Sequence, residues 1–296
     1  MTSRIRGSSS FDRGEPSHRT NITSKEDVER RMGELGGCTF DPTVQAYIPI
    51  HPERVDQAWL AQKELLREKI GPVYPKDSRE MGSWFWQNTA ISIDDLFVHA
   101  TQAAPFFKSF MEEIATAISG RTYFGEKDKH IVKTRASIEE KVKKIITEQT
   151  KYGQSFSERD AVITLNDSLR GTIIIDSIPQ CLTTLNMLRN ECAIVHYDLV
   201  FSNKFDANYP NGYVGIHAKV VYKYTFSGQK RSVVSEVQIH FNAIEDGTPS
   251  CPSQSTHGLY EESRKILSQD DESKARKEKL DAAIKLQFLI GMEKIA

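Results

Sequence analysis

The sequence predicts an α+β protein, in which a mixed β-sheet is flanked by helices and follows a helical N-terminal extension. Residues 214–226 and 231–241 alternate apolar with polar side chains on either side of the loop Ser227-Gly228-Gln229, which is the pattern of a β-hairpin. Before the hairpin, helical and β-branched stretches follow one another, an order typical of a sheet covered by helices. The chain has 296 residues, 39% of them hydrophobic, and can bury one good core, or a core and a small second domain.

The first third of the chain predicts helices without a visible site. Residues 1–25 are rich in Ser, Arg, Thr and Asn, so we expect a disordered tail, a feature also compatible with an injected effector. Residues 26–104 are the predicted helical extension, with a helix at 52–70 that ends at Gly71 and Pro72.

Further helices are expected at 92–103 and at 105–118, the second opened by Pro105. Between them and the first helix lies an aromatic cluster that predicts a packing anchor, Trp84, Phe85 and Trp86.

The middle of the chain supplies the rest of the expected sheet. A short β-branched strand is predicted at 172–175, a helix at 178–191 and another strand at 193–201. Residues 105–265 are expected to form the main domain. Residues 266–296 are expected to form a C-terminal helix, whose apolar end packs on the body of the protein or on another copy.

Composition excludes several classes of protein. The net charge of -1 gives no general positive field for duplex DNA or a membrane surface, although a local basic patch for RNA stays open. The four cysteines lie far apart and form no CxxC pair, so neither a disulfide framework nor a zinc site is expected. No apolar run reaches the length that spans a membrane. We expect a cytoplasmic protein, or a secreted effector that acts in a target cytoplasm.

One face of the predicted hairpin carries an unusual set of polar side chains. Because a strand has a period of two, Glu236, Gln238 and His240 share a face. On the partner strand, His217, Lys219 and Lys223 alternate with apolar residues. A carboxylate, an amide, imidazoles and amines on one face predict the floor of a polar site. The alternative is an ordinary strand face that contacts water.

A second polar group precedes the sheet. Lys133, Ser137 and Lys141 are spaced at four-residue steps and would share one face of a helix that began early. Two amines and a hydroxyl in this arrangement suit the phosphates of a nucleotide. Alternatively, Ser137 and Glu140 form a capping box and the lysines only contact solvent.

Two carboxylates are expected on neighbouring strands. Asp167 stands just before the predicted strand at 172–175, and Glu236 lies in the hairpin. Carboxylates that converge in this way commonly hold Mg²⁺ together with substrate phosphates, because Mg²⁺ prefers oxygen ligands. The alternative is that Asp167 only caps a turn.

In combination these motifs resemble the RelA/SpoT synthetase domain over residues 105–265. The resemblance is carried by four segments in order and a later helix, namely Lys133-xxx-Ser137-xxx-Lys141, Asp167 with Arg170-Gly171, Asn211-Gly212-Tyr213-xxx-His217, Glu236-x-Gln238-x-His240, and His257-Gly-Leu-Tyr260-Glu. It implies a nucleotidyltransferase-like fold and an enzyme that moves pyrophosphate from ATP to the 3′-hydroxyl of GDP or GTP, giving (p)ppGpp.

The resemblance also implies a role for each matching residue. The ATP-binding residues are expected to be Lys133, Arg135, Ser137 and Lys141. The acceptor-binding residues are expected to be Tyr213, His217, Gln238 and His240, with Tyr213 stacked on the base. Asp167 and Glu236 are expected to be catalytic and to hold Mg²⁺.

The sequence departs from the family pattern at two informative positions. Ile131 stands where the family usually has an Arg that stacks on the donor adenine, so Arg135 or Arg121 would have to replace it. His240 stands where an Arg is common, which removes a fixed positive charge.

These departures leave the acceptor open between a guanine nucleotide, an adenine nucleotide and, for a toxin-like member, the 3′ end of tRNA. A catalytically silent nucleotide-binding module is the alternative from another class. A homo-oligomer is also compatible with the sequence. The chain lacks a His-Asp dipeptide, so the hydrolase signature of the long bifunctional members is absent.

Overall fold

A computed structural model describes most of the chain, namely residues 25–73, 88–124, 131–153, 155–195, 198–245, 256–266 and 270–295. The expected disordered tail, apart from Lys25, and the aromatic cluster at 84–86 lie outside the described residues. No helix in these ranges is long and apolar enough to cross a membrane.

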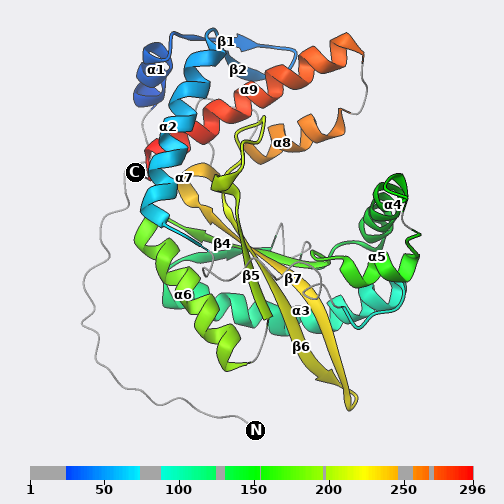
Figure 1. The fold of residues 1–296 in the computed structure, drawn as a ribbon. Helices are drawn as coiled ribbons and strands as arrows, with labels where there is room; N and C mark the ends of the chain where they lie inside the picture. Colours follow the sequence, from blue (N-terminus) through cyan, green and yellow to red (C-terminus); the bar gives the residue numbers. More distant parts are fainter. Residues whose placement is uncertain are drawn as a thin grey trace, which may run out of the picture.

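The centre of the fold is a mixed β-sheet of five strands in the order β3-β4-β7-β6-β5 (Figure 1). Strand β4 runs parallel to β7, and the other neighbouring pairs are antiparallel. This confirms the predicted fold class. The strands span Arg121–Tyr123 (β3), Leu169–Ile175 (β4), Asp198–Asn203 (β5), Ile216–Phe226 (β6) and Gln229–Phe241 (β7).

The predicted hairpin is confirmed, with a tighter turn than expected. Strands β6 and β7 close around Ser227 and Gly228 alone, and both residues have positive φ (49° and 77°). Two-residue turns of this kind match the right-handed twist of the strands. The register pairs His217 with Gln238 and Lys219 with Glu236, so the polar residues of both strands lie on one face as predicted.

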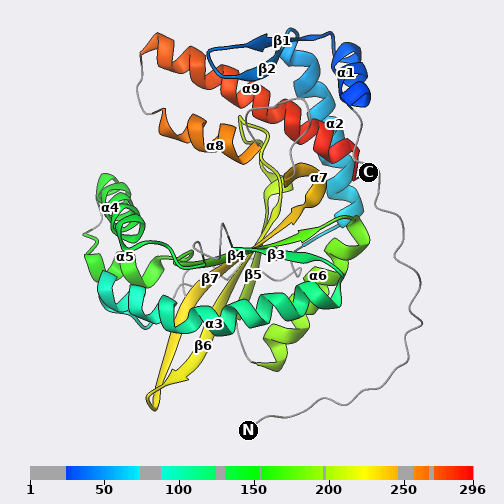
Figure 2. The same cartoon turned by 180° about the vertical axis from the view of Figure 1, so that it is seen from behind.

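Two long helices cover the opposite, apolar face of the sheet (Figures 1 and 2). They are α3 (Ile93–Ala117) and α6 (Ile178–Ile194). Gly171 of β4 faces α3, and a Cβ atom added there would lie 2.7 Å from the Sδ atom of Met111. A glycine is needed here because the helix approaches the strand so closely.

Helix α3 corrects the expectation of two helices separated at Pro105. It runs without a break through Pro105, although proline removes one backbone donor. Its buried stripe continues on both sides of the proline, and burial of this stripe outweighs the local cost. The stripe consists of Leu96, Ala100, Ala103, Phe107, Met111 and Ile114. The boundary predicted between residues 104 and 105 falls inside this helix.

The elements before the hairpin differ from expectation at their ends. Helix α6 continues to Ile194, so β5 begins at Asp198 and not at residue 193. Strand β4 begins at Leu169, earlier than the predicted strand, because Leu169 and Arg170 already pair with β7.

A second group of elements lies beyond one end of the sheet (Figure 1). Helix α2 (Pro52–Ile70) confirms the predicted helix, and the C-terminal helix α9 (Asp271–Glu293) packs along it. The buried apolar end of α9 therefore packs on the body of the same chain. Helices α7 (Asn242–Glu245) and α8 (Thr256–Lys265) join α9 to the end of β7.

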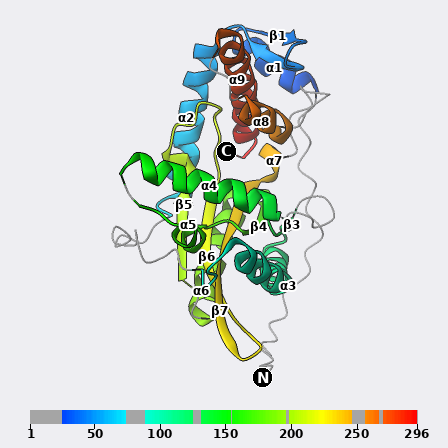
Figure 3. The ribbon, with the colours of Figure 1, turned by 90° about the vertical axis from the view of Figure 1, so that its right-hand side faces the viewer.

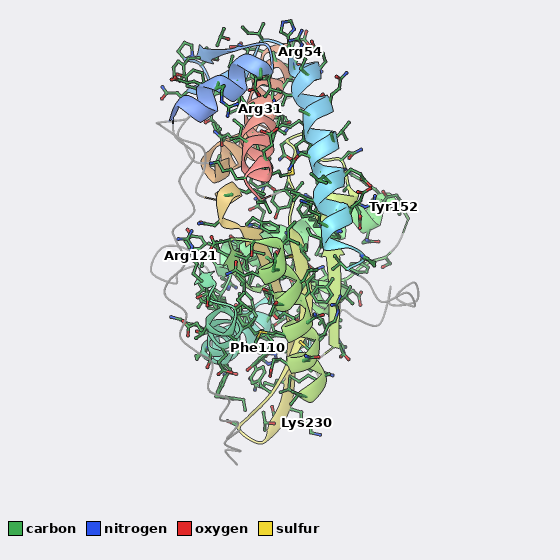
Figure 4. The ribbon with its side chains drawn as sticks, turned by 90° about the vertical axis from the view of Figure 1, so that its left-hand side faces the viewer. Arg31, Arg54, Phe110, Arg121, Tyr152 and Lys230 are labelled. Carbon is green, nitrogen blue, oxygen red and sulfur yellow. The ribbon has the colours of Figure 1, made fainter. Side chains whose placement is uncertain are left out.

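The N-terminal extension also contains a short hairpin that the sequence analysis did not predict. Strands β1 (Cys38–Asp41) and β2 (Ala46–Pro49) pair between α2 and a first helix, α1 (Lys25–Glu34). Arg31 of α1 points to α9 and donates a 2.9 Å hydrogen bond to Glu293 (Figure 4). The extension is thus not purely helical, and its helices α1 and α2 both contact α9.

Helices α4 (Arg135–Lys151) and α5 (Glu158–Thr164) pack together on the side of the molecule away from α2 (Figure 1), and they lie in the foreground of Figure 3. A capping box of Ser157 and Asp160 begins α5. The segment before α4 crosses the start of β4, where Val132 bridges to Leu169. This crossing brings Lys133 to the sheet.

Candidate functional site

The candidate site lies on the face of the sheet that α3 and α6 do not cover. We call this the polar face, and its members alternate along three strands, β4, β6 and β7. Helix α4 borders it near the start of β4, and helices α8 and α9 border it near the start of β6. The polar face includes Thr172, His217, Lys219, Glu236, Gln238 and His240.

Asp167 is the first centre of this face. Its Oδ2 atom lies 3.0 Å from the Nζ atom of Lys133 and also pairs with the Nζ atom of Lys141. The backbone places Lys133 here, because its N–H donates to the carbonyl of Ser168 over 2.9 Å. The Oδ1 atom of Asp167 is buried and has no hydrogen-bond partner among the described residues. Asp167 therefore does more than cap a turn.

The start of α4 differs from both predictions for this segment. The helix begins at Arg135, so Lys133 precedes it and does not share a helical face with Ser137 and Lys141. Thr134, and not Ser137, is the N-cap, and its hydroxyl accepts a hydrogen bond from the N–H of Ser137. The hydroxyl of Ser137 accepts from that of Thr134 over 2.9 Å.

The charges around Asp167 shift its pKa and that of Lys133. Burial alone would raise the pKa of Asp167, but the charges of Lys133 and Lys141 outweigh burial and hold that pKa below its usual value. Burial lowers the pKa of Lys133, and Asp167 opposes this shift only in part. The carboxylate is thus strongly favoured as an anion, and two amines share it.

Glu236 is the second centre, and both of its oxygen atoms are occupied. Oε2 pairs with the Nζ atom of Lys219 and lies 3.5 Å from Nδ1 of His217. Oε1 accepts a 2.7 Å hydrogen bond from the side-chain amide of Gln238. The amine of Lys219 is also 3.3 Å from the backbone carbonyl of Asn166, so it links Glu236 to the segment that carries Asp167.

The same contacts explain the ionisation of this group. Burial would raise the pKa of Glu236, but the hydrogen bond from His217 and the charge of Lys219 hold that pKa far below its usual value. Burial lowers the pKa of Lys219 and of His217, and Glu236 opposes both shifts. Glu236 is consequently an anion across the physiological range.

Tyr213 joins two histidines at the other end of the polar face. Its hydroxyl lies 2.7 Å from Nε2 of His217 and 3.0 Å from Nε2 of His240. Its ring stacks on that of Tyr260 from α8, with centroids 6.2 Å apart, and meets the edge of Phe288 from α9. Tyr213 is therefore fixed by its hydroxyl and by its ring.

The structure thus gathers most of the predicted site residues on one surface. They form two clusters that Lys219 and Asn166 connect. The cluster around Asp167 contains Lys133 and Lys141, and the cluster around Glu236 contains Gln238, His217, Tyr213 and His240.

Arg135 is not joined to these clusters. Its guanidinium pairs with Asp94 over 2.5 Å and also with Glu139, and the side chain is half exposed. Ile131 is buried in the core, and Arg121 contacts Asn242.

A divalent cation fits this surface at one atom in particular. Asp167 Oδ1 is a buried oxygen without a hydrogen-bond partner in the part of the chain that the structure describes, as a metal ligand would be in the protein alone. Glu236 fits less well, since both its oxygens already accept hydrogen bonds. Within the described ranges, no three His, Cys, Asp or Glu side chains come together as a metal cluster.

Lys219 is the functional candidate that the sequence analysis placed on the polar face without giving it a role. The alternation along β6 could have indicated a role for Lys219, because the β6–β7 register places Lys219 directly opposite Glu236. Asn166 gave no such signal, since its contact with Lys219 depends on how the loop before β4 folds.

Neither family models nor curated proteins match the sequence. Among solved structures, the fold is similar to small alarmone synthetase 1 from Bacillus subtilis bound to its product pppGpp. The two share 17% identity and a TM-score of 0.43 over 64% of this chain and 90% of that one. A GTP pyrophosphokinase family protein from Streptococcus pneumoniae shares 15% identity and a TM-score of 0.39, over 66% and 89% of the two chains. The likeness is distant.

Proposed function

We propose that this protein transfers the pyrophosphate group of ATP to the 3′-hydroxyl of a guanine or adenine nucleotide, and so makes (p)ppGpp-like alarmones. One observation carries the proposal. Lys133 and Lys141 converge on Asp167, and a separate cluster around Glu236 and Tyr213 lies on the same face. Transfer between two nucleotides requires a phosphate-binding end and an acceptor-binding end on one surface.

The Asp167 cluster suits the phosphates of the donor. Lys133 and Lys141 bring two amines to a single carboxylate oxygen, so positive charge exceeds negative charge at this point. Lysine binds phosphate as a point charge, and partial burial strengthens that interaction. Mg²⁺, when bound at Asp167, would neutralise charge on the transferring phosphates. The lysines would hold the polyphosphate in line with the acceptor.

The Glu236 cluster suits the hydroxyl and base of the acceptor. Glu236 is an anion, and its Oε1 atom, which accepts one hydrogen bond from Gln238, can accept a second from the 3′-hydroxyl. Because the pKa of Glu236 is lowered, its main contribution is to orient the hydroxyl, with proton removal a weaker one. Tyr213 offers an aromatic ring held by His217 and His240, which suits stacking against a base.

The test uses ATP labelled at the γ-phosphate together with Mg²⁺, and offers GDP, GTP, ADP, ATP and tRNA in separate reactions. We expect label to be transferred to one of these acceptors, which identifies the acceptor. We expect no transfer by Glu236→Gln or by Asp167→Asn. No transfer to any acceptor by folded protein that still binds ATP would overturn the proposal.

A second candidate, a nucleotide-binding module without turnover, is favoured by a specific observation. Ile131 is buried in the core at the position of the family's adenine-stacking Arg, and Arg135 is paired with Asp94 and Glu139. Ile131 offers no guanidinium for an adenine, and the guanidinium of Arg135 is already paired with two carboxylates. Binding of ATP without transfer in the assay above would select this candidate, and transfer to tRNA would select a toxin.

A further inference from the structure

Lys219 is a largely buried lysine at the centre of the polar face, between the two carboxylates. We propose that Lys219 is a positioning residue that holds the carboxylate of Glu236 and keeps it out of the coordination of a divalent cation, which is then bound through Asp167 alone. The proposal adds to the function proposed above. It rests on that function only in assigning Glu236 a part in pyrophosphate transfer. It replaces the expectation that Asp167 and Glu236 hold the cation together.

The geometry leaves Lys219 little freedom. It lies directly opposite Glu236 in the β6–β7 register, and both strands are interior strands of the sheet. The side chain is only 12% exposed, and its amine contacts Glu236 as well as the carbonyl and side-chain oxygens of Asn166, each at 3.3 Å. All three acceptors converge on one ammonium group, which can donate three hydrogen bonds.

Glu236 has little capacity left for a cation. Lys219 and His217 occupy Oε2, and Gln238 occupies Oε1. A cation at the one acceptor position left on Oε1 would lie next to the ammonium group of Lys219, which repels it. Asp167 differs, because its Oδ1 atom is buried and has no partner among the described residues.

The balance of charge also favours a cation bound through Asp167 and not through Glu236. Within the two clusters, the amines of Lys133, Lys141 and Lys219 face the carboxylates of Asp167 and Glu236, so positive charge is already in excess. Lys219 supplies at Glu236 the positive charge that a shared metal ion would otherwise provide. The cation and the ammonium group therefore act on different carboxylates.

The test measures Mn²⁺ binding to the full chain by the loss of the electron paramagnetic resonance signal of the free ion. Lys219→Met removes the amine and keeps an unbranched side chain of similar length. Lys223→Met is the matched control, because Lys223 lies on the same face of β6 but is half exposed and pairs with Asp198 over 2.9 Å. Glu236→Gln, Asp167→Asn and the double variant Lys219→Met with Glu236→Gln complete the set.

We expect Glu236→Gln and Lys223→Met to change Mn²⁺ affinity by less than about twofold, and Asp167→Asn to reduce it by about tenfold or more. Lys219→Met should increase Mn²⁺ affinity by about tenfold, because it leaves a buried carboxylate without its counter-ion, and the double variant should abolish this gain.

Two results would overturn the proposal. One is a loss of Mn²⁺ affinity in Glu236→Gln as large as that in Asp167→Asn. This comparison does not use Lys219→Met, so it tests the proposal even if that variant does not fold. The other is an unchanged affinity in folded Lys219→Met. Mn²⁺ binding requires no turnover, so the two proposals can fail separately. If the wild-type protein transfers no label but the variants show the expected Mn²⁺ affinities, the proposed function is refuted and the role of Lys219 is supported.

Discussion

The indole Nε1 of Trp59 donates a 3.0 Å hydrogen bond to the carbonyl oxygen of Gly212, and so ties helix α2 to the loop that carries Tyr213. Lys63, one turn further along α2, contacts Asn208 and the carbonyl of Ala207 in the same loop. The N-terminal extension thus holds the loop before β6 from one side. Helices α8 and α9 hold Tyr213 from the other.

The first prediction concerns this connection. Trp59→Phe keeps an aromatic ring in the core but leaves the carbonyl of Gly212 without its donor, at a cost of about 1 kcal/mol. We expect the KM for the acceptor nucleotide to rise about fivefold, while the KM for ATP stays the same, because Lys133 and Lys141 do not contact this loop. Steady-state kinetics with each substrate varied in turn measure both constants.

Hydrogen exchange gives a readout of the same variant that needs no activity. Amides of residues 207–215 should exchange faster in Trp59→Phe and at the wild-type rate in the control Leu60→Ala, since Leu60 is exposed on α2. Unaltered exchange in Trp59→Phe would show that the hydrogen bond does not restrain the loop.

The second prediction separates backbone strain from crowding at two glycines. Gly212 and Gly228 both have positive φ, 72° and 77°. A Cβ atom at Gly212 would lie 2.8 Å from Cγ of Lys285 and 3.0 Å from Nε1 of Trp59, whereas a Cβ atom at Gly228 would meet nothing within 4 Å. Gly228→Ala should lower the free energy of unfolding by about 1 kcal/mol, through strain alone.

Gly212→Ala should lower the free energy of unfolding by about 2–4 kcal/mol, because strain and overlap with a buried ring add together. Urea unfolding of the two variants and the wild type measures the difference. Equal losses in both variants would mean that the loop moves away from α2 without cost.

The hairpin could be predicted from sequence because its signal is local. Alternation along β6 and β7 fixes which residues share a face, and burial of the other face then fixes the register that places Lys219 opposite Glu236. The chemical importance of that pair did not follow from the pattern, because the same pattern is compatible with an ordinary exposed lysine at position 219. Only the low exposure of both side chains in the structure distinguishes a site residue from an exposed one.

Other features depend on contacts between distant segments. Pro105 predicts a helix start by local rules, but burial of Ala103 and Phe107 on either side of it keeps α3 continuous. The β1–β2 hairpin has no alternating pattern and is held against α9. Lys133 reaches Asp167 through the bridge between Val132 and Leu169, which no spacing along the chain could show.

The third prediction concerns the proposed donor end of the site. Lys141→Met removes one of the two amines that share Asp167, and with it a point charge for the donor phosphates. We expect the affinity for a non-reactive ATP analogue, measured by isothermal titration calorimetry, to fall about tenfold, which corresponds to about 1.4 kcal/mol.

Lys144→Met provides the control on the same helix. Lys144 is exposed and lies 3.9 Å from Glu148, and we expect its replacement to leave the affinity within about twofold of the wild type, as is usual for an exposed pair. Equal losses in the two variants would indicate that the general charge of α4, and not the amine at Asp167, attracts the nucleotide.

The fourth prediction concerns His99, a buried histidine of α3 that lies outside the site. Its Nε2 atom lies 3.2 Å from Asp95, and its Nδ1 atom is buried with no hydrogen-bond partner among the described residues. Burial lowers the pKa of His99, the charge of Arg231 lowers it further, and Asp95 opposes both. The folded protein therefore binds a proton at His99 less readily than the unfolded chain does.

The sign of the pH effect follows from that difference. As the pH falls through about 6.5, the unfolded chain takes up a proton at this position before the folded protein does, so the folded state loses stability. His99→Gln cannot take up this proton, so its stability should fall less steeply between about pH 7.5 and pH 5.5 than that of the wild type. Urea unfolding at several pH values measures the two slopes, with the exposed His51→Gln as the control for loss of an imidazole. A His99→Gln variant whose stability falls as steeply as that of the wild type would show that His99 does not link folding to protonation.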